Sequence, residues 1–249
     1  MNIQKYLDRI KYDSEVETSK ELLFGLHKQH LLNIPFENLD IYHRKKIELD
    51  LEKIYQKIIL KKRGGFCYEL NSLFNELLRG IGFDTFLISG RVYKDNDTYG
   101  PEFDHMAIIV TLECELYLVD VGFGKFILEP LKFVLDIPQI DNFGTFVIDN
   151  FSGDNFKVNK LESTIKIPEY IFNLNERQLS DFNDMCDFHQ TSKNSHFTKN
   201  KVISIADTNG RVTLTNETLK ITKDDITNTF EFEKSEFEYF LDKYFDMQI

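Results

Sequence analysis

The chain of 249 residues carries 30 Lys and Arg against 41 Asp and Glu, which gives a formal net charge of −11. Hydrophobic residues make up 42% and aromatic residues 14%, a globular composition that excludes a disordered or fibrous protein. The acidic excess leaves few clustered cations to displace the counterions of a phosphate backbone, so nucleic acid is not an expected partner.

The chain shows no segment typical of export or of membrane insertion. Residues 1–17 mix charges with isolated apolar positions, and no uncharged apolar stretch approaches the roughly 20 residues that a membrane-spanning helix needs. Cys67, Cys114 and Cys186 form an odd, widely spaced set, which argues against a disulfide framework. We therefore expect a cytoplasmic protein without a membrane partner, in which one cysteine is free for chemistry.

Helical patterns occupy the first third of the chain. The leucines of residues 22–31 predict a helix that ends before Pro35. Asp50 is a candidate N-cap for a second helix that ends before Gly64, with apolar residues at helical spacing: Leu51, Ile54, Tyr55, Ile58 and Ile59. A third amphipathic segment begins at Cys67 and ends near Gly80, which places Cys67 in the first turn and facing inward.

From residue 83 onward the hydrophobic period changes. Residues 83–93, 103–112 and 116–123 are rich in β-branched and aromatic residues and predict buried strands. Residues 181–189 predict a short helix, and Asn209-Gly210 predicts the turn of a later hairpin. Ser235 and Glu238 predict a capping box for an amphipathic helix that closes the chain.

Residues 63–67, Arg-Gly-Gly-Phe-Cys, favour a reactive cysteine. The two glycines let the backbone approach a ligand, and the helix N-terminus that follows them favours a negative charge. Both effects stabilise a thiolate, which is the nucleophilic form of cysteine. The alternative is that Cys67 is a small buried hydrophobe on a core helix, a common environment for a free cysteine. This segment alone leaves both interpretations open.

His105 and Asp120 lie on two strands that a hairpin would bring together. If Glu113-Cys114 is the two-residue turn, residue 107 faces residue 120, so His105 and Asp120 are diagonal neighbours on one face. A shift of one residue would place them on opposite faces, and each also has an ordinary structural explanation, as a core histidine and as a turn former. Together with Cys67 they supply a nucleophile, a base and a group that orients the base.

Four motifs, in this order, resemble those of the arylamine N-acetyltransferases. They are Ile-Pro-Phe-Glu-Asn-Leu at 34–39, Arg-Gly-Gly-Phe-Cys at 63–67, Asp-His-Met at 104–106 and Val-Asp-Val-Gly-Phe-Gly at 119–124. A fifth segment, residues 190–197, is similar to a later family motif but has Lys193 where proline is usual. The resemblance covers about residues 1–215 well and the remainder only in general character.

The resemblance implies an α+β fold with a cysteine-protease or transglutaminase-like core. Its parts would be an N-terminal helical bundle at 1–82, a central β-barrel at 83–195 and a C-terminal α/β lid at 196–249, a division that coincides with the order of the predicted elements. It also implies an acyltransferase that moves acetyl from acetyl-CoA, through a cysteine thioester, to an arylamine, arylhydrazine or hydroxylamine. Cys67, His105 and Asp120 would form its catalytic triad.

The same resemblance assigns the ligand contacts. Phe36, Asp104 and Phe123 would lie at the acceptor, and Glu37 would pair with Arg63 beneath it. Four residues would lie near coenzyme A: Pro101, Glu102, Phe188 and Asn194. The dense basic clusters at 44–46 and 61–63 could hold its phosphates, although the sequence does not tie them to the site.

No metal is expected, and two further functions stay open. Cys186, His189 and His196 lack the further ligands of a structural zinc site. A papain-like or transglutaminase-like amidohydrolase would use the same three residue types, and only a coenzyme requirement and an amine pocket would separate it from a transferase. A catalytically silent binding protein of the same fold is the other alternative, which the presence of all three residue types disfavours.

Overall fold

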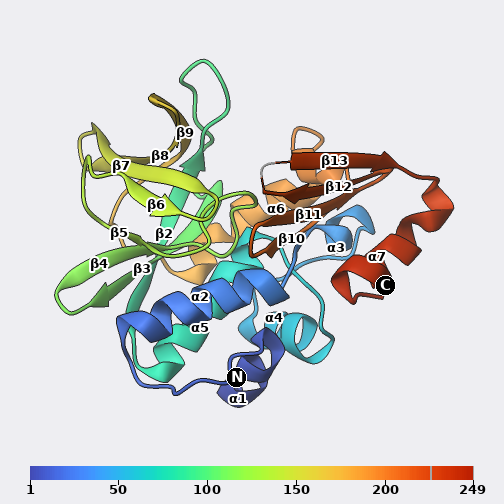
Figure 1. Cartoon of the computed structure of the whole chain (residues 1–249), viewed down its shortest axis with the longest axis horizontal. Coiled ribbons are helices and arrows are strands. Elements are labelled where there is room, and N and C mark those ends of the chain that lie inside the picture. Colours follow the sequence, from blue (N-terminus) through green and yellow to red (C-terminus); the bar gives the residue numbers. More distant parts are fainter. Residues whose placement is uncertain (225, 249) are drawn as a thin grey trace.

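The computed structural model describes residues 1–224 and 226–248. Helices from the first third of the chain lie beside an eight-stranded antiparallel sheet, and a five-stranded antiparallel sheet with a closing helix lies on the other side (Figure 1). No helix within the described residues is both long and apolar enough to cross a membrane.

The N-terminal helices begin at side-chain caps. Asn2, Ser19 and Asp50 each accept a hydrogen bond from a backbone N–H of the first turn that follows. The helices are α1 (Ile3–Ile10), α2 (Lys20–Asn33), α3 (Leu39–Tyr42), α4 (Leu51–Tyr55) and α5 (Cys67–Ile81). The predicted stop before Pro35 is confirmed. The helix predicted from Asp50 starts correctly, but its second half is a π-helical turn, Gln56–Leu60, in which Lys61 N donates to Gln56 O.

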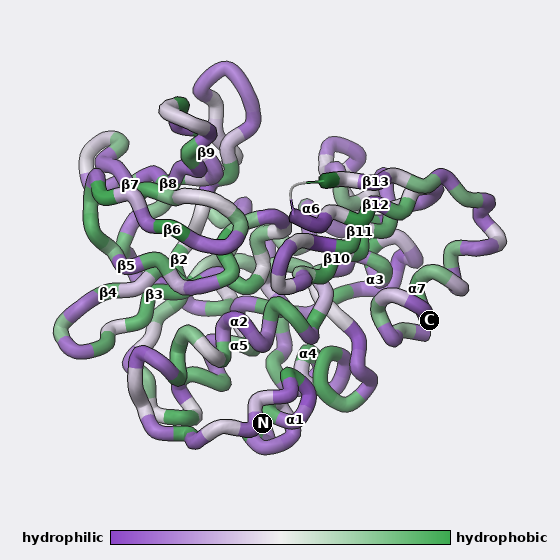
Figure 2. Tube along the Cα trace, in the orientation of Figure 1, coloured by the Kyte–Doolittle hydropathy of each residue, from purple (hydrophilic) through white to green (hydrophobic). Residues whose placement is uncertain are grey.

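The eight-stranded sheet is rolled around its own core. Its strands are β2 (Asp84–Val92), β3 (His105–Leu112), β4 (Glu115–Val119), β5 (Leu131–Lys132), β6 (Gln139–Asp141), β7 (Gly144–Ser152), β8 (Asn155–Glu162) and β9 (Ile165–Phe172). They are ordered β5-β4-β3-β2-β9-β8-β7-β6. Ala107 and Ile109 of β3 pack with Phe146 of β7 and Phe172 of β9, so strands far apart in the order share one interior. Figure 2 shows hydrophobic strands and a hydrophilic loop projecting between β2 and β3.

Alternation along β3 decides which residues face which core. Met106, Ile108 and Val110 join the apolar cluster of the helices, whereas Ala107 and Ile109 face the interior of the rolled sheet. His105 lies two residues before Ala107 on the strand and therefore points to the same face as Ala107 and Ile109. The third predicted strand ends at Val119 instead of residue 123, because the chain leaves the ladder before Asp120 and continues as a loop.

The five-stranded sheet combines residues from both ends of the chain. Its strands, in spatial order, are β1 (Phe36–Glu37), β10 (Val202–Asp207), β11 (Gly210–Thr215), β12 (Thr218–Lys223) and β13 (Ile226–Glu231). Asn38 strengthens the β1–β10 junction: its amide donates to Phe197 O (2.9 Å) and Asn200 O (2.7 Å) and accepts from Val202 N (2.8 Å).

Two local predictions for the C-terminal part were wrong by one or two residues. The hairpin turn is Thr208–Asn209, because Gly210 already pairs with Asp207, and a side chain at Gly210 would overlap the carbonyl of Thr222 on β12. The closing helix α7 (Phe237–Phe245) follows a 3₁₀ turn, Lys234–Glu236, in which Glu236 caps Glu233 N, so the predicted Ser235–Glu238 box does not form. The predicted short helix at 181–189 is α6 (Asn183–Thr191).

Candidate active site

Cys67 is the first residue of α5 and is 4% exposed. The glycines before it allow a close approach of the backbone, as predicted, but the group that approaches is the chain segment of Pro35 and not a ligand. Gly65 N donates to Pro35 O (3.3 Å), Glu37 N donates to Gly65 O (2.8 Å), and a side chain at Gly64 would overlap the carbonyl of Pro35. The Gly-Gly pair therefore fixes Cys67 against the segment that carries Phe36.

His105 and Asp120 are in contact. His105 Nε2 lies 2.7 Å from Asp120 Oδ2, and both side chains are buried. The predicted turn is confirmed, because Leu112 pairs with Glu115 around Glu113-Cys114, and Ile108 pairs with Val119 in the predicted register. Both turn residues have positive φ (52° and 64°), the conformation of the turn type that suits a two-residue hairpin.

Two side chains that the sequence analysis did not single out hold Asp120. Asn71 Nδ2 donates to Asp120 Oδ1 (3.0 Å) and Tyr170 OH donates to Asp120 Oδ2 (3.1 Å), while Gly122 N donates to Oδ1 (3.0 Å). Asn71 Oδ1 also accepts from Val121 N (2.9 Å). Asn71 follows Cys67 by one helical turn, so the i, i+4 spacing was a usable signal. Tyr170 gave none, because its position depends on the pairing of β9 with β2.

Gly122 brings the Asp120 loop against Cys67. A Cβ atom at Gly122 would lie 2.8 Å from Cys67 Cα and 2.7 Å from Asn71 Nδ2, so only glycine allows this packing. Since Nε2 of His105 is engaged by Asp120, Nδ1 is the ring nitrogen left to exchange a proton with another group. The ring of His105 is enclosed by Phe123 (centroids 4.9 Å apart) and Tyr170 (5.3 Å).

The electrostatics of the three groups differ. Burial tends to raise the pKa of the Asp120 carboxyl, but the attraction of His105 and the hydrogen bonds from His105, Asn71 and Gly122 outweigh it, and the pKa lies below its usual value. Burial raises the pKa of the Cys67 thiol well above its usual value, and the charge of Asp120 adds to this effect. A thiol so placed needs a neighbouring proton acceptor to become a nucleophile.

Aromatic rings pack beside the Gly-Gly turn that precedes Cys67. Phe36 bridges to Gly65 through the backbone, and its ring lies 6.1 Å from that of Phe197, which is also 6.2 Å from Phe66. The carboxylate of Asp104 lies 3.4 Å from His189 Nε2 on α6.

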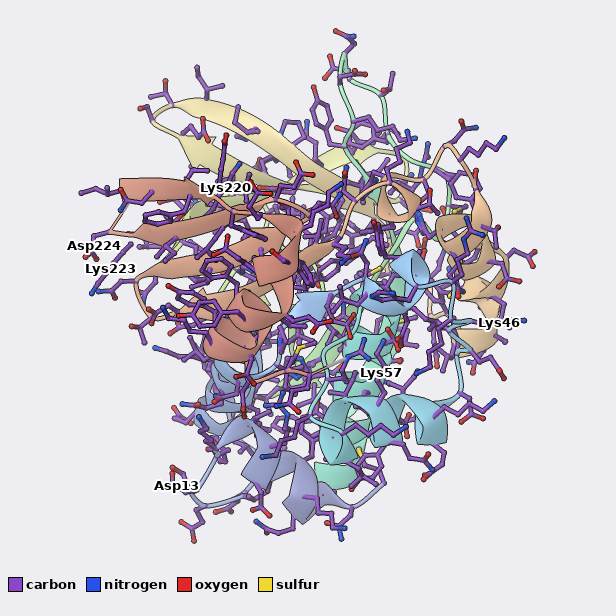
Figure 3. All side chains as sticks on the ribbon, turned by 90° about the vertical axis from the view of Figure 1, so that its right-hand side faces the viewer. Asp13, Lys46, Lys57, Lys220, Lys223 and Asp224 are labelled. Atoms are coloured by element: carbon purple, nitrogen blue, oxygen red, sulfur yellow. The ribbon has the colours of Figure 1, made fainter. Side chains whose placement is uncertain are left out.

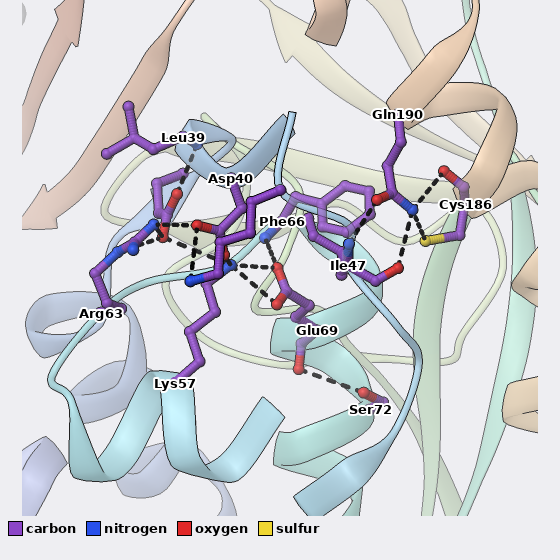
Figure 4. A network of polar contacts seen from close by, with 12 residues as sticks. Leu39, Asp40, Ile47, Lys57, Arg63, Phe66, Glu69, Ser72, Cys186 and Gln190 are labelled. Carbon is purple, nitrogen blue, oxygen red and sulfur yellow. Dashed lines mark hydrogen bonds and ion pairs between the residues drawn. The ribbon is translucent and has the colours of Figure 1, made fainter. Parts of the chain in front are cut away.

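The predicted pair of Glu37 and Arg63 is confirmed and belongs to a larger buried network (Figure 4). Arg63 Nη2 lies 2.7 Å from Glu37 Oε1 and 3.2 Å from Asp40 Oδ1. Lys57 Nζ lies 2.9 Å from Glu69 Oε2 and 3.0 Å from Asp40 Oδ2. Burial lowers the pKa of Lys57, but its carboxylate neighbours outweigh burial and raise it. Glu69 also caps Phe66 N (3.2 Å), so the network holds the start of α5.

The residues expected near coenzyme A lie on two segments. Pro101 and Glu102 precede β3, and Glu102 pairs with Arg177 (3.0 Å). Phe188 on α6 is 39% exposed, and Asn194 beyond it is exposed. His189 links the segments through Asp104. Cys186 Sγ accepts from Gln190, and residues 1–224 and 226–248 contain no cluster of three or more His, Cys, Asp or Glu that could hold a metal ion.

Comparisons with known proteins agree on one family. A family model described as N-acetyltransferase matches residues 20–249. The chain is 32% identical over 243 residues to the Gallus gallus arylamine N-acetyltransferase, pineal gland isozyme NAT-10, covering 90% of this chain and 84% of that protein.

Solved structures give the same result. The arylamine N-acetyltransferase from Salmonella typhimurium aligns with a TM-score of 0.91 at 27% identity, covering 98% of this chain and 90% of that one. An arylamine N-acetyltransferase from Bacillus cereus, described as having a unique Cys-His-Glu catalytic triad, aligns with a TM-score of 0.91 at 25% identity over 100% of both chains. These similarities confirm the predicted α+β fold class.

Proposed function

The chain belongs to the arylamine N-acetyltransferase family, and from this we propose that it carries acetyl from acetyl-CoA, through a thioester on Cys67, to an arylamine, arylhydrazine or hydroxylamine. The observation that carries the proposal is the buried His105–Asp120 pair, whose loop packs at Gly122 directly on the backbone of Cys67. This arrangement supports a nucleophile, a base and an orienting carboxylate in one cluster.

In the first half-reaction, His105 Nδ1 takes the proton of the Cys67 thiol while Asp120 holds Nε2–H and stabilises the imidazolium. The thiolate attacks the carbonyl carbon of the coenzyme thioester, and the C–S bond to the coenzyme breaks. His105 returns its proton to the departing coenzyme thiolate. Acetyl is then held on Cys67, and the imidazole is neutral again.

In the second half-reaction, the nitrogen of the acceptor attacks the thioester carbon on Cys67. The excess proton of the nitrogen passes to neutral His105, the C–S bond to Cys67 breaks, and the thiolate–imidazolium pair is restored. We assign Phe36, Asp104 and Phe123 to the acceptor. The contact of Phe123 with the His105 ring supports an aromatic wall that favours a flat amine over water.

We assign Pro101, Glu102, Phe188 and Asn194 to coenzyme A. The exposed ring of Phe188 and the contact of neighbouring His189 with Asp104, which brings α6 next to the start of β3, support this assignment. Coenzyme A enters here as a substrate, and no metal is part of the proposed chemistry.

Intact-protein mass spectrometry after incubation with acetyl-CoA tests the function. We expect a species one acetyl group heavier in the wild type and in Cys186→Ala, the matched variant of a second buried cysteine, and none in Cys67→Ala. An aromatic amine should discharge the adduct, and initial rates at several fixed amine concentrations should give parallel double-reciprocal lines.

Other outcomes identify the alternatives. An adduct that decays equally fast with and without amine would indicate a hydrolase. Intersecting lines without any adduct would indicate direct transfer in a ternary complex. Failure of every acyl donor to modify Cys67 in the folded wild type would indicate a silent binding protein.

A further inference from the structure

A hollow of about 970 Å³ lies between the loop that follows α3 and helix α6. Arg44, Lys45 and Lys46 line one wall, and Asp187, Gln190 and Lys193 line the other. Figure 3 shows Lys46 beside α6 and on the opposite side of that view from Lys220 and Lys223 of β12. The hollow is therefore remote from the lysines of β12.

The charge of the hollow runs against that of the chain. Four of its lining residues are cations and one, Asp187, is an anion, in a protein of net charge −11. Lys45 lies 3.9 Å from Asp40, but Arg44, Lys46 and Lys193 make no ion pair with any residue in 1–224 or 226–248. Cations concentrated in a concave surface raise the local concentration of anions, so the hollow suits a ligand with several negative charges.

Hydrogen bonds hold the two walls of the hollow in place (Figure 4). Ile47 N donates to Gln190 Oε1 (2.6 Å), and Gln190 Nε2 donates back to Ile47 O (3.1 Å). Because Ile47 directly follows the basic loop and Gln190 belongs to α6, this reciprocal pair fixes the cations relative to the helix. Such preorganisation reduces the entropy that binding would cost.

The same helix joins the hollow to the candidate active site. His189, next to Gln190, contacts Asp104, which precedes His105, and Cys186 packs in the same apolar cluster as Cys67. Gln190, which lines the hollow, donates to Cys186 Sγ (3.2 Å) one turn earlier on α6, so this helix contacts both the hollow and the apolar cluster that contains Cys67. A long ligand with phosphates at one end and a thioester at the other could reach both.

We propose that Arg44, Lys46 and Lys193 bind the phosphate groups at the nucleotide end of the acyl donor. This inference rests on the proposed function. The shared chemistry is an organic phosphate, and its two sources are the donor itself and a free nucleotide.

The test compares a donor that carries phosphates with one that does not. In the double variant Lys46→Glu/Lys193→Glu, kcat/KM for acetyl-CoA should fall on the order of tenfold relative to kcat/KM for p-nitrophenyl acetate, mainly through KM. Lys220→Glu/Lys223→Glu is the matched control, because both of its lysines are exposed and lie on β12. The control should leave this ratio unchanged.

Binding separates the two sources of phosphate. Adenosine 3′,5′-bisphosphate should compete with acetyl-CoA in the wild type and lose that competition in Lys46→Glu/Lys193→Glu. An equal fall of the ratio in both double variants, an unchanged ratio, or a bisphosphate that binds the hollow without competing would each overturn the proposal. Failure of the proposed function looks different, since neither donor would then acetylate Cys67 in the wild type.

Discussion

His105 Nε2 and Asp120 Oδ2 lie 2.7 Å apart because a single hairpin connects them: His105 begins β3, and Asp120 directly follows β4. Their contact depends on the register that the Glu113-Cys114 turn sets. A shift by one residue would turn the two side chains to opposite faces. The hairpin alone therefore brings His105 and Asp120 together, and the N-terminus of α5 places Cys67 beside the Asp120 loop.

Asp120→Asn should leave the fold intact and slow acetylation of Cys67 by roughly 10³–10⁴-fold, because an amide can select the wrong imidazole tautomer and cannot stabilise the imidazolium. Rapid-mixing measurement of coenzyme release checks the rate, and circular dichroism checks the fold. Asp149→Asn is the matched control, because it changes a carboxylate of the rolled sheet that pairs with Lys166, and it should keep the wild-type rate. Equal rates in all three proteins would remove Asp120 from the triad.

Gly122→Ala should lower the rate of acetylation by about 10²-fold, since the new methyl group would force Cys67 and the Asp120 loop apart. Gly153→Ala is the control. Gly153 has φ of +57°, and a Cβ atom there would meet no other atom within 4 Å, so alanine should cost stability without changing the rate. Thermal denaturation and single-turnover kinetics of both variants separate the two effects, and a rate loss shared by both would contradict the packing argument.

Lys57→Met should destabilise the protein by about 3–5 kcal/mol, because it leaves buried carboxylates without their cation. Lys53→Met removes a lysine from an exposed pair with Glu48 and should cost far less, because water screens that pair. Urea denaturation of both variants provides the comparison. Similar losses would mean that the network beneath the Gly-Gly turn contributes no more than a surface pair.

The raised pKa of the Glu169 carboxyl should make the free energy of unfolding depend on pH. Burial raises the pKa of this carboxyl to about 7, so the folded state binds more protons than the unfolded state between about pH 4.5 and 7. The free energy of unfolding should therefore fall as pH rises through this window, by up to about 3 kcal/mol, and level off above it. Glu169→Gln should remove this decline and be more stable than the wild type at pH 8, whereas Glu231→Gln, which removes an exposed carboxyl on β13, should follow the wild-type profile. Parallel profiles for all three would disprove the assignment.

The parts of the site that depend on local patterns could be predicted from the sequence. The cap at Asp50, the helix start at Cys67 and the β3–β4 register follow from spacing within one or two elements. Tyr170 could not be predicted, because it reaches Asp120 only through the pairing of strands distant in sequence.

The ionic network around Lys57 could not be predicted from the sequence for a similar reason. Lys57 lies on a π-helical turn that the regular spacing of apolar residues hides, and its partners come from three different elements. The glycines before Cys67 were recognised as sites of close approach, but the group that approaches, the Pro35 carbonyl, is set by tertiary packing.

The amide of Asn38 gives the C-terminal sheet a dependence on the other end of the chain. This one side chain satisfies two backbone carbonyls and one N–H of residues 197–202, some 160 positions later in the sequence. The C-terminal sheet therefore needs β1 and Asn38 for its completion. A nick between β9 and α6 would consequently yield an N-terminal fragment in which the Asn38 amide loses its three partners and a C-terminal fragment whose sheet lacks β1. Such fragments should recover their structure only by recombining with each other, which makes this junction a natural place to split the protein into a complementing pair.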